Sequence, residues 1–361
     1  MKVLITVPRL AMPGGVSNYY RTLRSHLDAD KVYLEIGGIP GESGRWRKLC
    51  RLLRDYWQFH RLLSKGRFDL VHVNPSMTPY AMFRDGIFVL IAKTYHLPVV
   101  VFYRGWNPKT EDAVRTRYPR LFRFVYGKAN ANIVLAEEFQ QTLRKAGLTG
   151  QFFVETTVVD DAVFADGGDA ARMTRKDAFR VLFLSRLDTG KGVPEALAAF
   201  AELQARRPDT SLIIAGDGPE RAAAEAEVAR RSLTGVSFLG HVAGTDKTRA
   251  FLEADAYLFT SLAEGMPNSV LEAMAFGLPV VTRPVGGIRD FFEEGRMGFA
   301  VDSTEPTDFA EPLARLADDP ALRSAIGSYN REYAASRFGA SRVAARLLDI
   351  YGEVVRTAAR S

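Results

Sequence analysis

The sequence predicts two α/β domains, each built on a doubly wound parallel sheet. Short apolar runs rich in Val, Ile, Leu and Phe alternate along the chain with longer segments of helical pattern. Such near-continuous apolar runs are typical of parallel strands that helices cover on both faces. At 361 residues, 47% hydrophobic and 25% charged, the chain is long for a single core. We therefore expect two domains facing a cleft, with binding loops at the carboxyl ends of the strands.

The predicted boundary between the domains is a segment rich in Gly, Ala, Asp and Arg at residues 165–177. We predict an N-terminal domain over residues 1–165 and a C-terminal domain over residues 166–340. Residues 341–361 are expected to form a closing helix that returns to the first domain, because apolar residues recur there at helical spacing (Val343, Leu347, Ile350 and Val354).

The first predicted element is a buried strand over residues 3–7, which leads into a glycine pair. Gly14 and Gly15 lie between this strand and a predicted helix, where glycine lets the backbone approach a ligand such as a phosphate. The third glycine of the dinucleotide-binding fingerprint is missing. Gly14 and Gly15 are therefore candidates for donor binding, and a plain strand-to-helix turn is the simpler interpretation.

A strongly amphipathic, basic helix is predicted over residues 45–63. Residues 44–67 hold eight basic residues and one acid, so this window has a charge of +7 in a chain whose net charge is +6. One interpretation is a crossover helix whose apolar half packs on the first sheet. The other is an interfacial segment over residues 45–65 that contacts an anionic membrane surface or a phosphorylated acceptor. Both interpretations stay open, and embedding of the helix in the membrane is not expected.

Two polar residues of the N-terminal half are candidates for contact with an acceptor or a donor sugar. His72 lies inside an apolar run, where a lone histidine is more often a satisfied core residue than a catalyst. Arg104 follows the strand predicted at residues 98–103, and its permanently charged guanidinium suits a phosphate or a carboxylate.

The C-terminal half repeats the strand–turn–helix pattern with polar residues in the turns. Arg186 and Lys191 leave the end of a predicted strand five residues apart, so both cations could reach one diphosphate. Simple solvation of both cations is the alternative. Later turns add candidates for donor binding, each with a plain turn or strand end as its simpler interpretation: Gly216, Asp217, His241 and Val242.

The most informative stretch runs from Leu262 to Val281. Glu264 lies in a turn after a buried strand, and a short helix is predicted next, with Asn268 or Ser269 as its N-cap and Gly277 as its stop. Free N–H groups and the positive end of the helix dipole suit a phosphate there. Two carboxylates beside such a site indicate a ligand with an anionic centre and several hydroxyls. The predicted donor-binding residues are Gly265, Met266, Pro267, Asn268, Ser269, Val270 and Glu272.

A simpler interpretation of the same stretch is that Glu264 complements the helix dipole and Glu272 is an exposed helix residue. The whole string favours function, because it resembles the Glu-x7-Glu signature of the retaining group-one glycosyltransferases, which form family four of the GT-B enzymes. In that family the first glutamate contacts the donor sugar and the second contacts the nucleotide ribose. Arg186 and Lys191 resemble the family's cation pair on the donor pyrophosphate. Arg104 departs from the family, which commonly has a histidine nearby.

The resemblance implies a GT-B fold of two Rossmann-like domains and a retaining, metal-independent glycosyltransferase without a cofactor. It would move a hexose-type sugar from a nucleoside diphosphate to a hydroxyl of a glycan or lipid-linked acceptor, with Glu264, Arg186 and Lys191 as catalytic residues. The basic helix favours bacterial cell-envelope polysaccharide synthesis, by analogy only. A nucleotide-sugar epimerase or hydrolase of the same fold and a non-catalytic nucleotide-sugar-binding protein are the alternatives.

The expected location is the cytoplasm. The only cysteine, Cys50, excludes an internal disulfide and suits a reducing compartment. We expect no signal peptide and no membrane span, because no apolar run approaches the ~20 residues that a span needs. Peripheral contact at the inner face of the membrane stays open, and no nucleic acid partner is expected. The donor base and sugar, the acceptor and the oligomeric state are not determined by the sequence.

Overall fold

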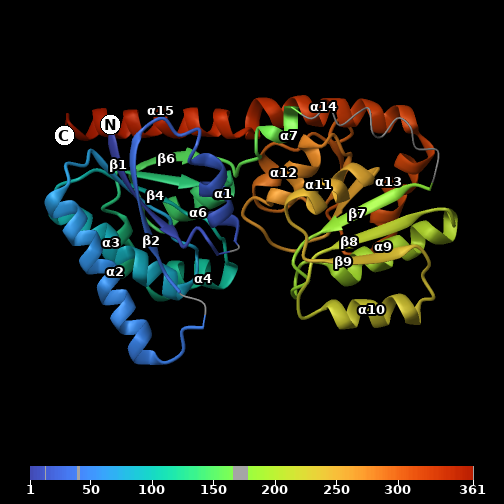
Figure 1. Cartoon of the computed structure of the whole chain (residues 1–361), viewed down its shortest axis with the longest axis horizontal. Coiled ribbons are helices and arrows are strands. Elements are labelled where there is room, and N and C mark those ends of the chain that lie inside the picture. Colours follow the sequence, from blue (N-terminus) through green and yellow to red (C-terminus); the bar gives the residue numbers. More distant parts are fainter. Residues whose placement is uncertain (13, 39–40, 166–177, 361) are drawn as a thin grey trace. The chain divides into compact units, whose positions relative to one another are not determined.

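The computed structural model describes residues 1–12, 14–38, 41–165 and 178–360 (Figure 1). The chain divides into two compact units, which we call unit 1 (Met1–Val158 with Ala340–Ser361) and unit 2 (Val159–Gly339). The division thus falls before the predicted boundary at residue 165, and nearly all of the predicted linker lies outside the described residues.

Unit 1 is built on a six-stranded sheet in which every pairing is parallel, in the order β2-β1-β3-β4-β5-β6. The central strands are buried along their whole length because each is a continuous apolar run or nearly so. The strand order reverses between β1 and β3. The strands are β1 (Lys2–Pro8), β2 (Asp30–Ile36), β3 (Leu70–Val73), β4 (Val99–Phe102), β5 (Ala131–Val134) and β6 (Gln151–Val154).

Helices cover this sheet, and the last helix of the chain belongs to the same unit. The apolar side chains of α15 (Ala340–Ala358) recur at helical spacing and are buried. The oxygens of Glu155 accept hydrogen bonds from Arg346 on this helix at 3.1 Å. The other helical segments are α1 (Gly15–Leu23), α2 (Arg45–Lys65), α3 (Pro79–Thr94), α4 (Pro108–Asp112), the π-helical turn η1 (Ala113–Arg117), α5 (Pro119–Tyr126) and α6 (Glu137–Lys145).

Helix α2 corrects the simpler interpretation of the basic segment. Its buried side chains are Phe59 and Leu63 together with the ion-paired Arg51 and Asp55. The tryptophans and leucines at the start of the predicted apolar half are exposed instead of packed on the sheet (Trp46, Leu49, Leu53 and Trp57). The helical periodicity of the sequence correctly groups the apolar residues on one side of the helix. The side that packs on the core is the neighbouring one, which carries the buried residues.

Unit 2 contains a second six-stranded sheet with parallel pairings, in the order β12-β11-β10-β7-β8-β9. The order reverses between β7 and β10. The strands are β7 (Arg180–Leu184), β8 (Ser211–Ala215), β9 (Val236–Gly240), β10 (Ala256–Phe259), β11 (Val280–Thr282) and β12 (Gly298–Ala300).

Two apolar clusters of unit 2 bury the faces of this sheet, one under α9, α10 and α13 and the other under α11, α12 and α14 (Figure 1). The predicted doubly wound α/β class is therefore confirmed in both units. The helices are α7 (Ala162–Ala165), α9 (Val193–Arg206), α10 (Arg221–Arg230), α11 (Gly244–Glu253), α12 (Asn268–Ala275), α13 (Pro306–Asp318) and α14 (Pro320–Phe338), with the 3-10 turn η2 (Gly286–Asp290).

Candidate functional site

The two central strands of unit 2, β7 and β10, end at the point where the strand order reverses. In open α/β sheets, ligands bind outside the carboxyl ends of the strands at this point. The loop after β7 carries Arg186 and Lys191, and the loop after β10 carries Glu264. The topology thus brings the predicted cation pair and Glu264, which come from distant parts of the sequence, to the same edge of the sheet.

Lys191 and Glu264 form an ion pair across these two loops. The ammonium nitrogen of Lys191 lies 2.6 Å from Oε1 of Glu264, and the hydroxyl of Ser261 donates to the same oxygen at 3.2 Å. The side chains of the pair are about a fifth exposed, 19% and 21%. This geometry holds the carboxylate in a fixed orientation while both charged groups keep contact with solvent.

The backbone of the two loops makes the pair possible. The amide of Leu262 donates to the carbonyl of Gly190 at 2.9 Å, and the hydroxyl of Thr260 donates to the carbonyl of Gly192 at 2.6 Å. Gly192 has a φ of +79°, and a Cβ atom placed there would lie 2.3 Å from the carbonyl oxygen of Thr260. Only glycine allows this close approach.

Arg186 behaves differently from Lys191. Its side chain is 76% exposed and pairs with Asp188 at 2.6 Å. The structure therefore gives each of the two predicted cations its own carboxylate. The prediction that both cations bind one diphosphate stays a prediction.

Helix α12 begins at Asn268, and the predicted N-cap is wrong. Pro267 has extended backbone and takes the N-cap position, and no side chain in the described part of the chain caps the helix. Asn268 and Ser269 are instead the first two residues of the helix, and both are half-buried. The predicted stop is confirmed, because Gly277 follows the C-cap with a φ of +69°.

Glu272 is buried, so its interpretation as an exposed helix residue is wrong. Its Oε1 lies 2.6 Å from the ammonium of Lys247 on α11. Burial raises the pKa of Glu272, and the charge and hydrogen bond of Lys247 lower it. The sequence gave no sign of Lys247, which lies near the start of a helix in a run of polar residues.

A glycine pair also supports the loop that carries Glu264. The amide of Gly287 donates to the carbonyl of Gly265 at 2.8 Å, and a Cβ atom on Gly286 would lie 2.3 Å from the carbonyl oxygen of Glu264. Arg283 is buried just before this pair, and its Nη1 donates to the carbonyl of Thr260 at 2.8 Å. The three segments therefore fix one another at the carboxyl end of β10.

The remaining donor candidates of unit 2 have local roles in the structure. Asp217 is exposed, accepts a hydrogen bond from the amide of Gly218 at 2.8 Å and lies 3.6 Å from Arg221. A Cβ atom on Gly216 would lie 1.7 Å from the carbonyl of Ser185, so this glycine permits a close backbone contact. Met266 and Val242 pack against the apolar cluster, Val270 belongs to it, and His241 is exposed.

The candidates of unit 1 lie at or near the ends of its strands. Gly14 and Gly15 are exposed, and Gly14 is the N-cap of α1. His72 is fully buried in β3, as the simpler interpretation predicted. Its Nδ1 lies 2.5 Å from the Tyr351 hydroxyl of α15 and its Nε2 lies 3.4 Å from the Tyr20 hydroxyl. Burial lowers the pKa of His72 well below its ordinary value, and Arg104 adds to this.

Arg104 is 5% exposed and lies in a pocket of aromatic rings. Its guanidinium carbon lies 3.5 Å from the ring centre of Phe102 and 3.8 Å from that of Tyr19. Its Nε donates to the side-chain oxygen of Asn74 at 3.1 Å, and its buried Nη2 has no hydrogen-bond partner among the residues that the structure describes. Cation–π contacts thus hold this charge, and binding of an anion by Arg104 stays a prediction.

Two family models match the chain. One is described as glycosyl transferases group 1 and matches residues 170–333, and the other is described as a glycosyl transferase 4-like domain and matches residues 8–151. The glycogen synthase of Mycobacterium tuberculosis (strain CDC 1551 / Oshkosh) is 30% identical over 292 residues, which cover 79% of this chain and 69% of that protein. The chain belongs to the group 1 glycosyltransferases. The alpha-D-kanosaminyltransferase of Streptomyces kanamyceticus is 27% identical to this glycosyltransferase over 89% of the chain and 86% of that enzyme.

Solved structures show the fold of this group 1 glycosyltransferase. Anabaena HepE in complex with UDP has a TM-score of 0.77 at 19% identity, with 98% of this chain and 100% of that chain covered. Sucrose-phosphate synthase from Thermosynechococcus elongatus also has a TM-score of 0.77, at 18% identity, with 99% and 100% covered. The predicted GT-B fold of the glycosyltransferase is confirmed.

Proposed function

We propose that this group 1 glycosyltransferase moves a hexose-type sugar from a nucleoside diphosphate to a hydroxyl acceptor and retains the anomeric configuration. The observation that carries the proposal is the Lys191–Glu264 ion pair at the point of strand reversal in unit 2. The HepE crystals that contain UDP or UDP-glucose support a nucleotide-sugar donor.

The chemical problem in this reaction is the negative charge that develops on the leaving diphosphate. In the proposed step the bond from the anomeric carbon to the phosphate oxygen breaks, and the acceptor oxygen bonds to the same face of that carbon. The acceptor proton passes to the leaving phosphate oxygen. Lys191, Arg186 and the uncapped N-terminus of α12 would stabilise the developing charge without a metal ion.

The two glutamates would hold the neighbouring rings. Glu264 already accepts hydrogen bonds from Lys191 and Ser261, so its carboxylate is oriented before the donor arrives. It would orient the sugar. Glu272, paired with Lys247 at 2.6 Å, would accept hydrogen bonds from the ribose hydroxyls. The amides between them, from Gly265 to Ser269, would contact sugar hydroxyls and the distal phosphate.

We further propose a glycan or lipid-linked acceptor and a role in bacterial cell-envelope polysaccharide synthesis at the cytoplasmic face of the membrane. The charge and exposure of α2 support this placement. Within the described ranges, the helices lack the combination of length and apolar character that a membrane crossing requires. The exposed basic residues of α2 would bring the protein to the surface of the membrane.

A donor panel tests the proposal. The purified chain is incubated with UDP-, GDP- and ADP-sugars, with and without glycan and lipid-linked acceptors, and both released nucleotide and glycosylated product are measured. We expect product only when an acceptor is present, with the anomeric configuration of the donor. Donor turnover without an acceptor would indicate an epimerase or hydrolase instead. Binding of a donor without turnover under any condition would indicate a non-catalytic protein.

A further inference from the structure

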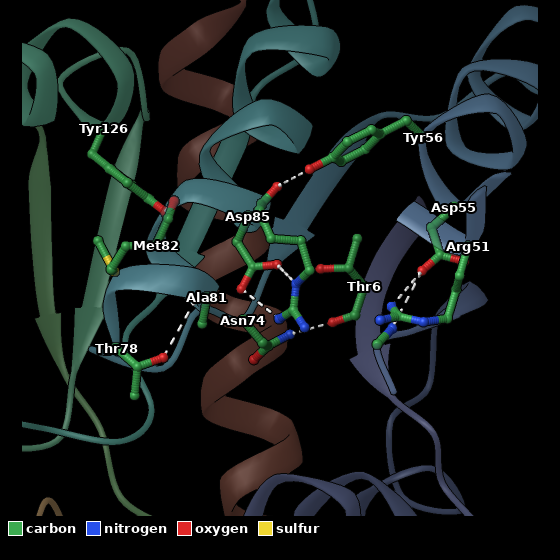
Figure 2. A network of polar contacts seen from close by, with 12 residues as sticks. Thr6, Arg51, Asp55, Tyr56, Asn74, Thr78, Ala81, Met82, Asp85 and Tyr126 are labelled. Atoms are coloured by element: carbon green, nitrogen blue, oxygen red, sulfur yellow. Dashed lines mark hydrogen bonds and ion pairs between the residues drawn. The ribbon is translucent and has the colours of Figure 1, made fainter. Parts of the chain in front are cut away.

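Three neighbouring helices of unit 1 share an outer surface, and α3 lies between the other two. The hydroxyl of Tyr56 on α2 donates to the carbonyl of Arg84 on α3 at 3.2 Å. The hydroxyl of Tyr126 on α5 donates to the carbonyl of Met82 on α3 at 2.6 Å. Figure 2 shows the two tyrosines reaching α3 from opposite sides. These two contacts, one buried and one partly buried, fix α2 and α5 along the flanks of α3.

Large apolar side chains on the outward sides of these helices are exposed to solvent. Trp46 is 78% exposed, Phe83 is 65% exposed and Phe124 is 61% exposed. Exposed apolar side chains gathered on adjacent elements indicate an interaction site, whereas scattered ones do not. We call the following group the outer apolar face: Trp46, Leu53, Trp57, Phe83, Leu121 and Phe124.

The order of side chains around α2 and α5 is the same on both flanks of α3. Successive residues of a helix are rotated by about 100° around its axis. Going around α2 from Tyr56, which touches α3, one meets first the exposed apolar residues (Leu53, Trp46 and Trp57) and then Arg54. On α5, Val125 touches α3, because a Cβ atom on Gly86 would lie 2.8 Å from it. Leu121 and Phe124 come next around the helix, and Arg120 and Arg123 follow. Each flank therefore runs from apolar residues near α3 to basic residues at the outer edge.

The exposed charges of this surface are all basic because its carboxylates are buried. The sequences of α2, α3 and α5 contain two acids, Asp55 and Asp85, which are 1% and 0% exposed. Asp55 lies 3.7 Å from Arg51, and Asp85 lies 2.7 Å from Arg84 (Figure 2). We call the following exposed basic residues, which lie beyond the apolar stripes of α2 and α5, the basic margin: Arg47, Arg54, Arg61, Lys65, Arg120 and Arg123.

Cations also lie beside the exposed rings. The guanidinium of Arg61 lies 5.3 Å from the ring centre of Trp57, and the ammonium of Lys128 lies 5.1 Å from that of Phe124. Aromatic rings with adjacent cations are the side chains that occupy the interface between headgroups and acyl chains.

We propose that the outer apolar face and its basic margin bind the surface of an anionic bilayer. The apolar side chains would enter the acyl boundary and the margin would contact lipid phosphates. A second copy of the chain fits less well, since pairing of this face with itself would bring two basic margins together. Nucleic acid would use the cations and the rings, but it gives no role to Leu53 and Leu121. The proposal rests on the membrane placement of the proposed function and names the surface that makes it, but it holds for any donor.

The only cysteine of the chain provides a direct probe. Cys50 is exposed on α2, within one turn of both Trp46 and Leu53. An environment-sensitive fluorophore on Cys50 should brighten and shift to the blue with vesicles in which roughly a third of the lipid is phosphatidylglycerol, because anionic lipid attracts the margin. Vesicles of phosphatidylcholine alone should give little change, and salt should weaken the response.

Variants of the unlabelled protein test the two parts of the surface by vesicle sedimentation. Arg54→Glu/Arg61→Glu should weaken binding to the anionic vesicles at least about tenfold, since each surface cation contributes roughly 1 kcal/mol. Trp46→Ala/Trp57→Ala should weaken it similarly through lost apolar burial. The matched controls, Arg206→Glu/Arg342→Glu for charge and Leu239→Ala for apolar surface, should bind as the wild type does.

Three results would overturn the proposal. One is the absence of vesicle binding by the wild type, and another is equal binding by the tryptophan variant. The third is sedimentation equilibrium that shows a wild-type dimer which Trp46→Ala/Trp57→Ala dissociates, because the face would then be an interface between copies. No donor or acceptor is present in these measurements, so a negative result leaves the proposed transfer reaction untouched.

Discussion

The ammonium nitrogen of Lys191 lies 2.6 Å from a carboxylate oxygen of Glu264, although 73 residues separate them in the sequence. The two residues follow the strands between which the sheet order of unit 2 reverses. A cation expected to hold phosphate and an acid expected to hold sugar therefore share one interaction before any ligand binds. Arrival of a diphosphate would give Lys191 a second anionic partner and leave the carboxylate oriented by Ser261.

Replacement of Glu264 should separate catalysis from binding. We expect Glu264→Ala to lower the rate of transfer by about a hundredfold or more, the loss typical of a removed electrostatic contact. The affinity of the protein for a nucleoside diphosphate, measured by calorimetry, should change little because Lys191 remains. Lys191→Ala should weaken both transfer and nucleotide binding. Normal turnover by Glu264→Ala would reject its role.

Lys247 should be essential to the stability of unit 2. Lys247→Ala would leave the buried carboxylate of Glu272 without its partner, a loss that typically costs about 3–5 kcal/mol in unfolding free energy. The double variant Lys247→Met/Glu272→Met should recover most of this. Arg221→Ala, which breaks the exposed pair with Glu225, should change the unfolding free energy far less than Lys247→Ala does, because water screens that pair. Urea unfolding measures all of these values.

The stability of Lys247→Ala has a predictable pH dependence. Burial raises the pKa of Glu272, and removal of Lys247 takes away the effect that lowers it. The folded state then holds a proton more tightly than the unfolded state, so its stability rises as pH falls through the folded pKa and declines as pH rises. The deficit of Lys247→Ala should therefore shrink on acidification. A deficit that is constant between the unfolded carboxyl pKa and neutral pH would contradict the assignment.

Two glycines of one loop provide a matched steric test. Gly190 and Gly192 have φ values of +87° and +79°, but a Cβ atom on Gly190 meets nothing within 4 Å. Gly190→Ala should therefore lower the unfolding free energy by only roughly 1–2 kcal/mol, the cost of placing a residue with a Cβ atom in the left-handed backbone conformation. Gly192→Ala should cost clearly more and reduce transfer, because the added atom overlaps Thr260 and displaces the loop that carries Lys191. Equal thermal stability and equal activity of the two variants would disprove the close approach.

Histidine titration should destabilise unit 1 at mildly acidic pH. Burial lowers the pKa of His72 well below 6.5, so below that pH the unfolded chain takes up a proton that the folded chain does not. Stability should fall as pH decreases through this range, and His72→Gln should remove that part of the slope. The exposed His60→Gln should not. The three tryptophans of the chain lie in unit 1, so their fluorescence follows this unit (Trp46, Trp57 and Trp106).

The alternation of strands and helices could be predicted from the sequence because both follow from local patterns of apolar residues. The loop positions of Lys191 and Glu264 could be predicted for the same reason. The sequence could not provide the pairing of Glu272 with Lys247, since no local pattern marks which polar residue of α11 meets a buried acid. Helix α2 shows another limit. Periodicity placed its apolar residues on one stripe, but Arg51 and Asp55 occupy the core side of the helix. Arg51 pairs with Glu42 at 2.8 Å and lies 3.7 Å from Asp55.

Unit 1 takes its residues from both ends of the chain, and this has a consequence for synthesis on the ribosome. Tyr351, whose hydroxyl contacts His72, is synthesised 279 residues after that histidine and after all of unit 2. Unit 2 is one continuous segment, so it can finish folding while the nascent N-terminal part still waits for its last helix. Of the two units, the one whose synthesis begins first is therefore completed second, and until then the apolar side chains of unit 1 that α15 covers stay exposed.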